Sequence, residues 1–367
     1  MLDNGRRQVD LLVVCSASTP GNRRSELELV SALRELGHDV ALATTDYGLL
    51  ARVPMSLNLM DLTRALSNRL ATRRALRRFA PRALIYGTAG AALLEPERRL
   101  ARAAVRFDSL AADNRPGLRH LLARLAERRM VAGAALLLPF SGPSSWPELA
   151  RRHPVRPIAL PTPVEPYAAS PQREPVAVCY GGAPEKKRLD LLIGAWGEAA
   201  LGERYRLAVT GLDAERGRRW LARRGIREPA GVSWHGRLEP DAYRELTSRA
   251  ELYLSASRYE DYGIAQLEAL ADGALLVTGP SPGPYEALSL ARSLDPRLVA
   301  DRLAVEPLAE ALRAAVTLSE AERQRYRTRA RELLEPYSRA AFRARLEHEV
   351  LPMLLNREAP RRRGQGY

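Results

Sequence analysis

The feature that most constrains the fold of this chain is an alternation of apolar runs and helical patterns that begins twice. In the first half, apolar runs typical of buried strands lie at 9–15, 39–44, 83–86, 104–107 and 134–139, and a helical pattern lies at 26–36. Buried parallel strands have such continuous apolar sequences because helices cover both faces of their sheet. The alternation therefore predicts a doubly wound α/β domain.

A proline-rich segment separates this domain from a second one. Seven prolines lie from Pro154 to Pro175 inclusive, which favours an extended linker over a regular helix. After the linker, apolar runs recur at 176–180, 205–210, 232–235, 252–255 and 275–278, with helical patterns at 189–196 and 264–271. The predicted parts are an N-terminal domain over 1–165, a C-terminal domain over 171–337, a last helix over 338–356 and a basic disordered tail over 357–367. Two such domains offer the carboxyl ends of their strands to one cleft.

Composition excludes several classes of protein. Hydrophobic residues make up 46% of the 367 residues, which excludes a disordered polyelectrolyte despite the net charge of +14. No apolar run reaches the roughly 20 residues of a membrane-spanning helix. Two cysteines in separate strand-like runs and five scattered histidines give neither a disulfide framework nor a metal cluster. We therefore expect a cytoplasmic protein without a metal site.

The loop between the first strand and the first helix of the second domain carries an unusual pair of cations. Lys186 and Lys187 are the two lysines among 57 basic residues. An ammonium group is a compact charge that can follow a phosphate, whereas a guanidinium prefers a fixed forked geometry. The alternative is a solvated pair at a helix start, but the rarity of lysine in this chain favours a phosphate site.

A second loop carries two carboxylates around a helix start. Glu260 lies in the loop, Gly263 opens a predicted helix over 264–271, and Glu268 lies about one turn into that helix. The unpaired N–H groups at a helix start favour an anion. Carboxylates on both sides of an anion site suit a ligand with hydroxyls at both ends and charge in the middle. A nucleotide sugar is such a ligand.

These residues resemble the family 4 retaining glycosyltransferases of the two-domain GT-B architecture. The resemblance rests on Glu260 and Glu268, with seven residues between them in a Y-E-D-Y-G…E-A-L-A-x-G setting, and on P-E-K-K-R-L-D-L-L-I at 184–193. It implies two Rossmann-like domains facing a central cleft and a last helix that returns to the N-terminal domain. It also implies a metal-independent transfer from a nucleotide-diphosphate sugar, with no other cofactor, to a hydroxyl of a glycan, lipid-linked or small-molecule acceptor.

The resemblance further implies roles for single residues. Glu260 beside the transferred sugar and Lys187 at the leaving diphosphate are the expected catalytic residues. Glu268 is expected to accept hydrogen bonds from the ribose hydroxyls. The other expected donor-binding residues are Lys186, Gly182, Gly263, Ile264, Gly21, Arg237 and Leu238.

Three positions depart from the family pattern. Gly182 stands where the family often has arginine, so Lys186 or Arg188 is the candidate second diphosphate cation. Gly21 follows a proline instead of another glycine. Asp108 stands where a histidine is common, and it either meets the sugar or acceptor or caps a helix. Two alternatives therefore stay open: a nucleotide-sugar epimerase or hydrolase on the same fold, and a degenerate transferase that only binds.

The segment 64–82 contains seven arginines and no acidic residue. The pattern predicts a helix ended by Pro81, with the apolar face Ala75, Leu76, Phe79 and Ala80 opposite the arginines Arg73, Arg74, Arg77 and Arg78. One interpretation is docking on an anionic membrane surface, peripheral on the inner face; the others are a solvated basic helix or a site for an acidic glycan. Nucleic-acid binding is not expected, because Phe79 is the main aromatic residue nearby.

Overall fold

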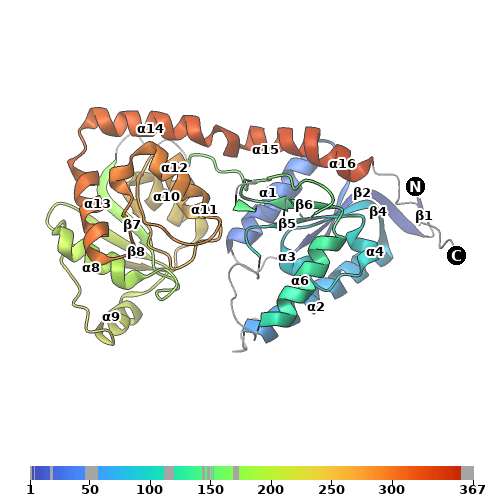
Figure 1. Ribbon diagram of the computed structural model, residues 1–367, viewed down its shortest axis with the longest axis horizontal. Helices are drawn as coiled ribbons and strands as arrows, with labels where there is room; N and C mark the ends of the chain where they lie inside the picture. Colours follow the sequence, from blue (N-terminus) through green and yellow to red (C-terminus); the bar gives the residue numbers. More distant parts are fainter. Residues whose placement is uncertain are drawn as a thin grey trace. The chain divides into compact units, whose positions relative to one another are not determined.

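The computed structural model describes residues 2–3, 5–16, 20–45, 57–110, 120–142, 145–146, 149, 151, 153–167 and 173–356. The chain divides into two compact units (Figure 1). Unit 1 takes the described residues up to Pro163 and those from Arg339 onward, and unit 2 is Val164–Ser338. The predicted basic tail over 357–367 lies outside the described residues.

Unit 1 is built on a mainly parallel sheet. Its described strands are β1 (Leu2–Asp3), β2 (Arg6–Cys15), β3 (Val40–Thr44), β4 (Phe79–Tyr86), β5 (Ala103–Phe107) and β6 (Leu136–Pro139). The order is β1-β2-β4-β5-β6, with β3 also paired to β2. The short β1 is antiparallel to β2, and the other pairs are parallel. Leu11, Leu12, Val13 and Val14 are fully buried, as expected for a strand with both faces covered.

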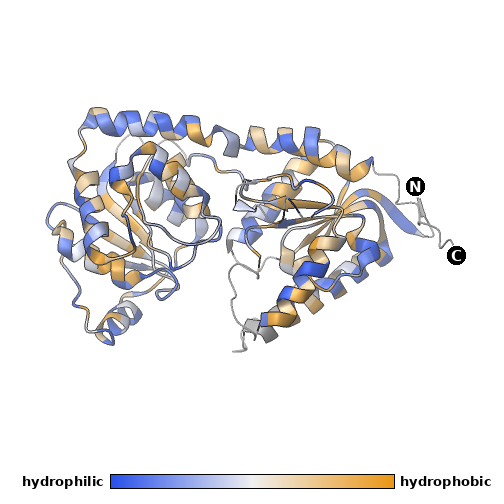
Figure 2. Ribbon diagram, in the orientation of Figure 1, coloured by the Kyte–Doolittle hydropathy of each residue, from blue (hydrophilic) through white to orange (hydrophobic). Residues whose placement is uncertain are grey.

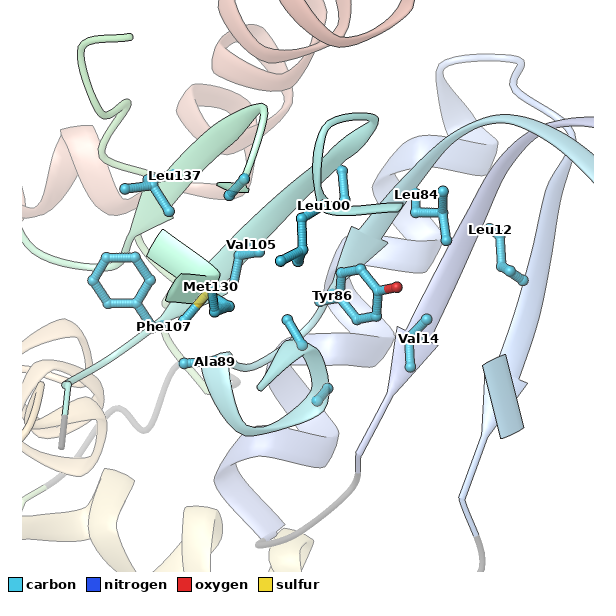
Figure 3. Packing of buried hydrophobic residues seen from close by; sticks show 14 of the residues in the cluster. Leu12, Val14, Leu84, Tyr86, Ala89, Leu100, Val105, Phe107, Met130 and Leu137 are labelled. Atoms are coloured by element: carbon cyan, nitrogen blue, oxygen red, sulfur yellow. The ribbon is translucent and has the colours of Figure 1, made fainter. Parts of the chain in front are cut away.

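Helices cover both faces of this sheet. One face carries α1 (Pro20–Glu35) and the C-terminal segments α15 (Arg339–Arg345), η6 (Leu346–Val350) and α16 (Leu351–Leu355). The other carries α2 (Leu57–Arg78), α3 (Ala89–Ala92), α4 (Glu97–Leu100) and α6 (Leu121–Gly133). Figure 3 shows the core on this second face, where Met130 and Leu100 lie near Tyr86, Val105 and Phe107. Right-handed crossover connections explain which helices share a face. The connection from β2 to β3 runs in one direction across the sheet, whereas the connections from β3 to β4 and from β5 to β6 run in the other. Their helices therefore pack on opposite faces.

The C-terminal helical run continues past a proline. Residues 346–350 form a π-helical turn directly before α16, whose first turn contains Pro352. Proline has no N–H for the helical ladder, and a widened turn accommodates the missing bond. Pro352 therefore does not break the last turn, which extends to Leu355 and buries Leu351 and Leu354.

The predicted end of the arginine-rich helix was wrong. Helix α2 ends at Arg78, and Phe79 and Ala80 begin strand β4 instead of completing an apolar helix face. The helical conformation is unfavourable for a residue directly before a proline, so Ala80 is extended. Pro81 fits inside the strand because β5 pairs with β4 only from Leu84 onward, so on that side no partner requires its missing N–H.

Unit 2 is built on a fully parallel sheet in the order β11-β10-β7-β8-β9. Its strands are β7 (Glu174–Tyr180), β8 (Arg206–Thr210), β9 (Val232–Gly236), β10 (Ala250–Leu254) and β11 (Leu275–Val277). Its helices are α8 (Leu189–Ala199), α9 (Ala214–Ala222), α10 (Pro240–Arg249), α11 (Ile264–Ala271), α12 (Glu286–Leu294), η4 (Pro296–Leu298), α13 (Val305–Thr317), α14 (Glu320–Leu334) and η5 (Glu335–Tyr337).

The predicted fold class, two doubly wound α/β units, is confirmed. Figure 2 shows the central strands of both units in hydrophobic colours between helices with hydrophilic outer faces. In the part of the chain that the structure describes, no helix is both long and apolar enough to cross a membrane.

Candidate functional site

The lysine loop, residues 181–188, leads from the carboxyl end of β7 into α8. Gly181 N–H donates to Thr210 O at 2.7 Å, and Lys187 N–H donates to Ala183 O at 2.8 Å. Arg188 adopts a left-handed conformation (φ 49°, ψ 49°) at the start of α8, which is unfavourable for a residue other than glycine. The lysine side chains therefore project from a backbone that internal hydrogen bonds hold in one conformation.

Lys187 forms an ion pair with the first predicted carboxylate. Its Nζ lies 2.8 Å from Glu260 Oε2, which also accepts from Ser257 Oγ at 2.6 Å and Gln266 Nε2 at 3.2 Å. The Glu260 side chain is 9% exposed and that of Lys187 is 22% exposed. Within the described residues, the hydrogen bonds to this carboxylate converge on Oε2, so Oε1 is left available to a ligand hydroxyl.

Backbone contacts hold Glu260 from behind. Its N–H donates to Pro282 O at 3.0 Å, and Ser281 Oγ donates to Ser257 O at 2.5 Å. Gly283 has φ +108°, and a Cβ at this position would lie 2.3 Å from Glu260 O. Only glycine fits there, so the segment 281–283 supports the loop that carries Glu260.

The second lysine connects the same two loops. Lys186 Nζ lies 3.1 Å from Asp261 Oδ2, and Arg258 N–H donates to Lys186 O at 2.8 Å. The Lys186 side chain is 49% exposed, so solvent screens this pair more than the pair at Lys187. The structure thus brings together both predicted lysines and Glu260.

Gly263 and Ile264 form the predicted helix start. Gly263 is buried and left-handed (φ 83°) directly before α11, and a Cβ there would lie 2.7 Å from Tyr285 Cε2. The first N–H groups of a helix have no partner within it, and they carry partial positive charge. The end of α11 therefore offers donors to an anion next to the loop of Glu260.

Glu268 lies in a buried ionic network that the sequence did not reveal. Its Oε2 lies 3.4 Å from Arg244 Nη1 in α10, and Arg244 Nη2 donates to Asp272 Oδ1 at 2.9 Å and to Glu165 O at 3.0 Å. Tyr167 N–H also donates to Asp272 Oδ1, at 2.7 Å. The side chains of Arg244 and Glu268 are 7% and 8% exposed. The orientation of Glu268 is therefore coupled to α10 and to the chain that enters unit 2.

Burial raises the pKa of Asp272 to about 6, because desolvation and the nearby Glu268 outweigh the Arg244 guanidinium and the Tyr167 N–H. The folded state thus binds the Asp272 proton more strongly than the unfolded state, whose pKa is near 3.8. The contribution of this group to stability is fully present below pH 3.8 and is lost as the pH rises through 6.

For Asp272→Asn we expect this part of the pH dependence to disappear, because the amide does not titrate. The melting temperature of the natural chain minus that of the variant should fall between about pH 4 and pH 6 and level off above. Thermal unfolding followed by circular dichroism at several pH values measures it. Parallel curves across that range would contradict the assignment.

The remaining predicted donor residues lie farther along the same edge of unit 2. Arg237 and Leu238 follow β9, which is separated from β7 by β8. Arg237 is exposed and Leu238 is half-buried. Among the described contacts, neither touches the cluster of Lys187 and Glu260.

The side chain of Tyr180 occupies the space next to Gly182. A Cβ at Gly182 would lie 2.3 Å from Tyr180 Oη, and one at Gly211 would lie 2.5 Å from Tyr180 Cε2. The Tyr180 ring, 43% exposed, therefore lies against both glycines at the start of the lysine loop. Sequence reasoning missed Tyr180, because it reads as the last residue of an apolar strand. Its phenol takes the space in which an arginine side chain at 182 would begin.

The two predicted residues of unit 1 are placed differently from each other. Gly21 was expected in the first loop of the N-terminal domain, but helix α1 begins at Pro20, so Gly21 lies in the first turn of this helix. A Cβ at this position would have nothing within 4 Å. Asp108 follows β5 and is half-buried. The helix that it was expected to cap falls on 111–119, outside the described residues.

A polar cluster that the sequence did not reveal lies at the carboxyl edge of unit 1. Ser16, directly after β2, donates from its N–H to Glu26 Oε1 at 2.7 Å, and Thr88 Oγ1 donates to Ser16 Oγ at 3.2 Å. A Cβ at Gly87 would lie 2.6 Å from Glu26 Oε1, and Glu26 is 1% exposed. In the sequence, Glu26 looks like any surface glutamate of a helix, so nothing indicated its burial.

The sequence profile of the glycosyl transferases group 1 matches residues 166–333. No curated protein sequence matches the chain.

Solved structures with similar folds cover nearly the whole chain. WaaG, a glycosyltransferase involved in lipopolysaccharide biosynthesis, aligns with 93% of this chain and 100% of its own, at 16% identity and a TM-score of 0.66. Sucrose-phosphate synthase from Thermosynechococcus elongatus aligns with 96% and 100%, at 14% identity and a TM-score of 0.73. HepE from Anabaena, solved with UDP-glucose, aligns with 93% and 99%, at 11% identity and a TM-score of 0.65. At these identities the likeness shows the fold.

Proposed function

Because the sequence profile of the group 1 glycosyltransferases matches residues 166–333 and the chain has the fold of WaaG, we propose that it moves a sugar from a nucleotide-diphosphate sugar to an acceptor hydroxyl with retention of anomeric configuration. The premise is that the chain is a glycosyltransferase that uses a nucleotide sugar. Retention, the acceptor and the residue roles are the proposal. The observation that carries it is the pair of Lys187 with Glu260 beside the start of α11.

Lys187 acts on the leaving group in this proposal. The bond between the anomeric carbon and the diphosphate oxygen breaks, and the electron pair leaves with the phosphate. The ammonium group and the N–H groups of Gly263 and Ile264 stabilise that growing negative charge. The acceptor oxygen bonds to the anomeric carbon on the same face, and its proton passes to the departing phosphate oxygen. Lys186, at the outer rim of the same loop, adds a second cation.

Glu260 and Glu268 hold the two ends of the donor. Glu260 Oε1 accepts a hydrogen bond from a hydroxyl of the transferred sugar, while Oε2 is held by hydrogen bonds from Ser257, Gln266 and Lys187. Glu268 accepts hydrogen bonds from the ribose hydroxyls, and Arg244 fixes the orientation of the Glu268 carboxylate. UDP-glucose, the ligand in the HepE structure, is the first donor to test.

Glu268→Ala and Glu268→Gln are expected to weaken binding of UDP by about 10- to 100-fold, because charge-assisted hydrogen bonds contribute about 1.5–3 kcal/mol. Isothermal titration calorimetry measures the affinity. Glu251→Gln is the matched control, since Glu251 is also a buried, ion-paired carboxylate of unit 2, bonded to Tyr205 and Arg323. The control should lose stability and keep UDP affinity. Full affinity in both Glu268 variants would overturn the proposed donor site.

Product analysis with and without acceptor tests the reaction class. Sugar released as free hexose, or as an epimer, without acceptor would indicate the hydrolase or epimerase alternative. Binding of UDP-glucose without any turnover would indicate a degenerate transferase. Among the acceptor classes we propose the lipid-linked one, because the exposed faces of α2 and α6 carry leucine and arginine side chains suited to an anionic membrane surface.

A further inference from the structure

The exposed face of α2 is divided into an apolar half and a basic half. Toward the start of the helix, Leu62, Leu66 and Leu70 recur every four residues and are 46%, 46% and 50% exposed. Toward its end, the exposed residues are Arg73, Arg74, Arg77 and Arg78. The buried face is small and polar, with Ala65, Asn68, Thr72 and Ala75. The predicted opposition holds for Ala75 and Leu76, which pack against the core while the arginines are exposed. The exposed face also carries leucines, which precede the arginines along it.

Helix α6 repeats this division. Leu121, Leu122 and Leu125 near its start are 45%, 81% and 48% exposed, and Arg128 and Arg129 behind them are exposed. Its acidic residue, Glu127, is 6% exposed and Met130 is buried in the core. Of the described side chains on the two helices, none that is acidic is exposed.

On both helices the leucines precede the arginines, and both helices lie on the same side of the sheet. Ala75 of α2 and Met130 of α6 belong to one core cluster, and α2 links β3 to β4 as α6 links β5 to β6. Each helix runs back from the carboxyl end of one strand to the amino end of the next parallel strand. The leucine-bearing starts therefore lie toward the carboxyl edge of the sheet, and the arginines lie farther along each helix, toward the amino edge. Figure 1 shows the course of both helices.

We propose that this leucine–arginine surface docks on a bilayer that contains anionic lipids. The surface consists of Leu62, Leu66, Leu70, Leu121, Leu122 and Leu125, with Arg73, Arg74, Arg77, Arg78, Arg128 and Arg129. Six exposed leucines in two groups are unusual for a surface that faces only water. A bilayer would cover such leucines at the acyl boundary and offer its anionic headgroups to the arginines that follow them. No exposed acid lies among those side chains of the two helices whose burial the structure describes, so charge complementarity selects an anionic partner for the six arginines.

The spacing along the helices fits the depth of a lipid interface. From Leu70 to Arg73 the rise is about 5 Å, and from Leu70 to Arg78 it is about 12 Å, at 1.5 Å per residue. With the leucines at the acyl boundary, the arginines lie within the headgroup layer, which their long side chains can span. Docking at this surface would bring a lipid-linked acceptor to unit 1, a consequence that deepens the proposed function and rests on it.

The test is co-sedimentation of the full chain with vesicles of phosphatidylcholine alone and of an equal mixture with phosphatidylglycerol. We expect binding to the mixed vesicles that falls with added salt, and far weaker binding to phosphatidylcholine. Reversal of Arg73, Arg74, Arg77 and Arg78 to glutamate should lower partitioning by about 100-fold or more, since each arginine near an anionic surface contributes substantially. Leu66→Ser with Leu122→Ser should lower it about tenfold at unchanged charge.

The matched control reverses four exposed arginines of unit 2, Arg216, Arg218, Arg219 and Arg223, for the same change in net charge. It should retain most vesicle binding. Absence of binding by the natural chain, or equal loss in the control, would overturn the proposal. The proposal would also be overturned if the leucine variant kept its vesicle binding but had a lower oligomeric mass by light scattering. The surface would then be covered by a second copy of the chain. UDP affinity, measured in every variant, should stay unchanged, so a failed donor site and a failed membrane surface give different results.

Discussion

Lys187→Ala is expected to lower kcat/KM for donor turnover by about 10²- to 10³-fold, the usual cost of removing one charge-stabilising group from an active site. Lys187 is partly buried and lies 2.8 Å from Glu260 Oε2, so its ammonium group reaches the centre of the candidate site. Initial rates with UDP-glucose, with product identified by mass spectrometry, measure the effect. Most of the loss should appear in kcat, because the charge on the leaving diphosphate grows in the transition state.

Lys186→Ala is the comparison that makes this result specific. The two lysines are adjacent in one loop, but Lys186 is half-exposed and pairs with Asp261 at the rim. Its removal should cost about tenfold or less, because water screens an exposed charge. Thermal unfolding of both variants checks that the loop is intact. Equal losses for the two lysines would mean that the loop supplies only general positive charge and that the ion pair with Glu260 has no special role.

The fold was predictable because its signal is local. Continuous apolar runs such as 9–15 and 176–180 mark strands that are buried on both faces, and their spacing leaves room for helices. The lysine pair was also predictable, because lysine is so rare in this chain. The first signal can be seen within a short window of sequence, and the second requires only a count over the chain.

The contacts that shape the site join residues far apart in the sequence. Arg244 reaches Glu268 from another helix, Tyr180 covers Gly211, and Ser281 fixes Ser257. No periodicity or local motif encodes such pairs, because they form only when strands that are distant in the chain become neighbours in the sheet.

The arginine-rich helix shows how a local signal can mislead. Its composition indicated a basic helix, which is present, but the hydrophobic period placed Phe79 and Ala80 on it and left the leucines before Arg73 unassigned. The buried face of α2 consists of small and polar side chains, so the core contacts leave little hydrophobic pattern. The period correctly placed Ala75 and Leu76 toward the core, but it gave no sign that the leucines before Arg73 are exposed.

Gly283→Ala is expected to damage the site without touching any predicted functional residue. The φ of +108° is unfavourable for alanine, which costs about 1–3 kcal/mol of stability. The new Cβ would also lie 2.3 Å from Glu260 O, a backbone atom that cannot move away as a flexible side chain can. Glu260 must shift with its loop, and a displacement of about 1 Å at a reacting group costs on the order of 10²-fold in rate.

Gly225→Ala separates the two effects, because Gly225 also has a left-handed φ of +66° but nothing within 4 Å of its Cβ position. It should lose about 1 kcal/mol in urea unfolding and keep full turnover. In Gly283→Ala, the loss of turnover should exceed what the loss of stability explains, since at low temperature the variant is folded and still slow. If the two alanine variants match in both stability and turnover, the segment 281–283 does not position Glu260. The backbone contact at Gly283 would then have no effect on the position of the Glu260 carboxylate relative to the donor.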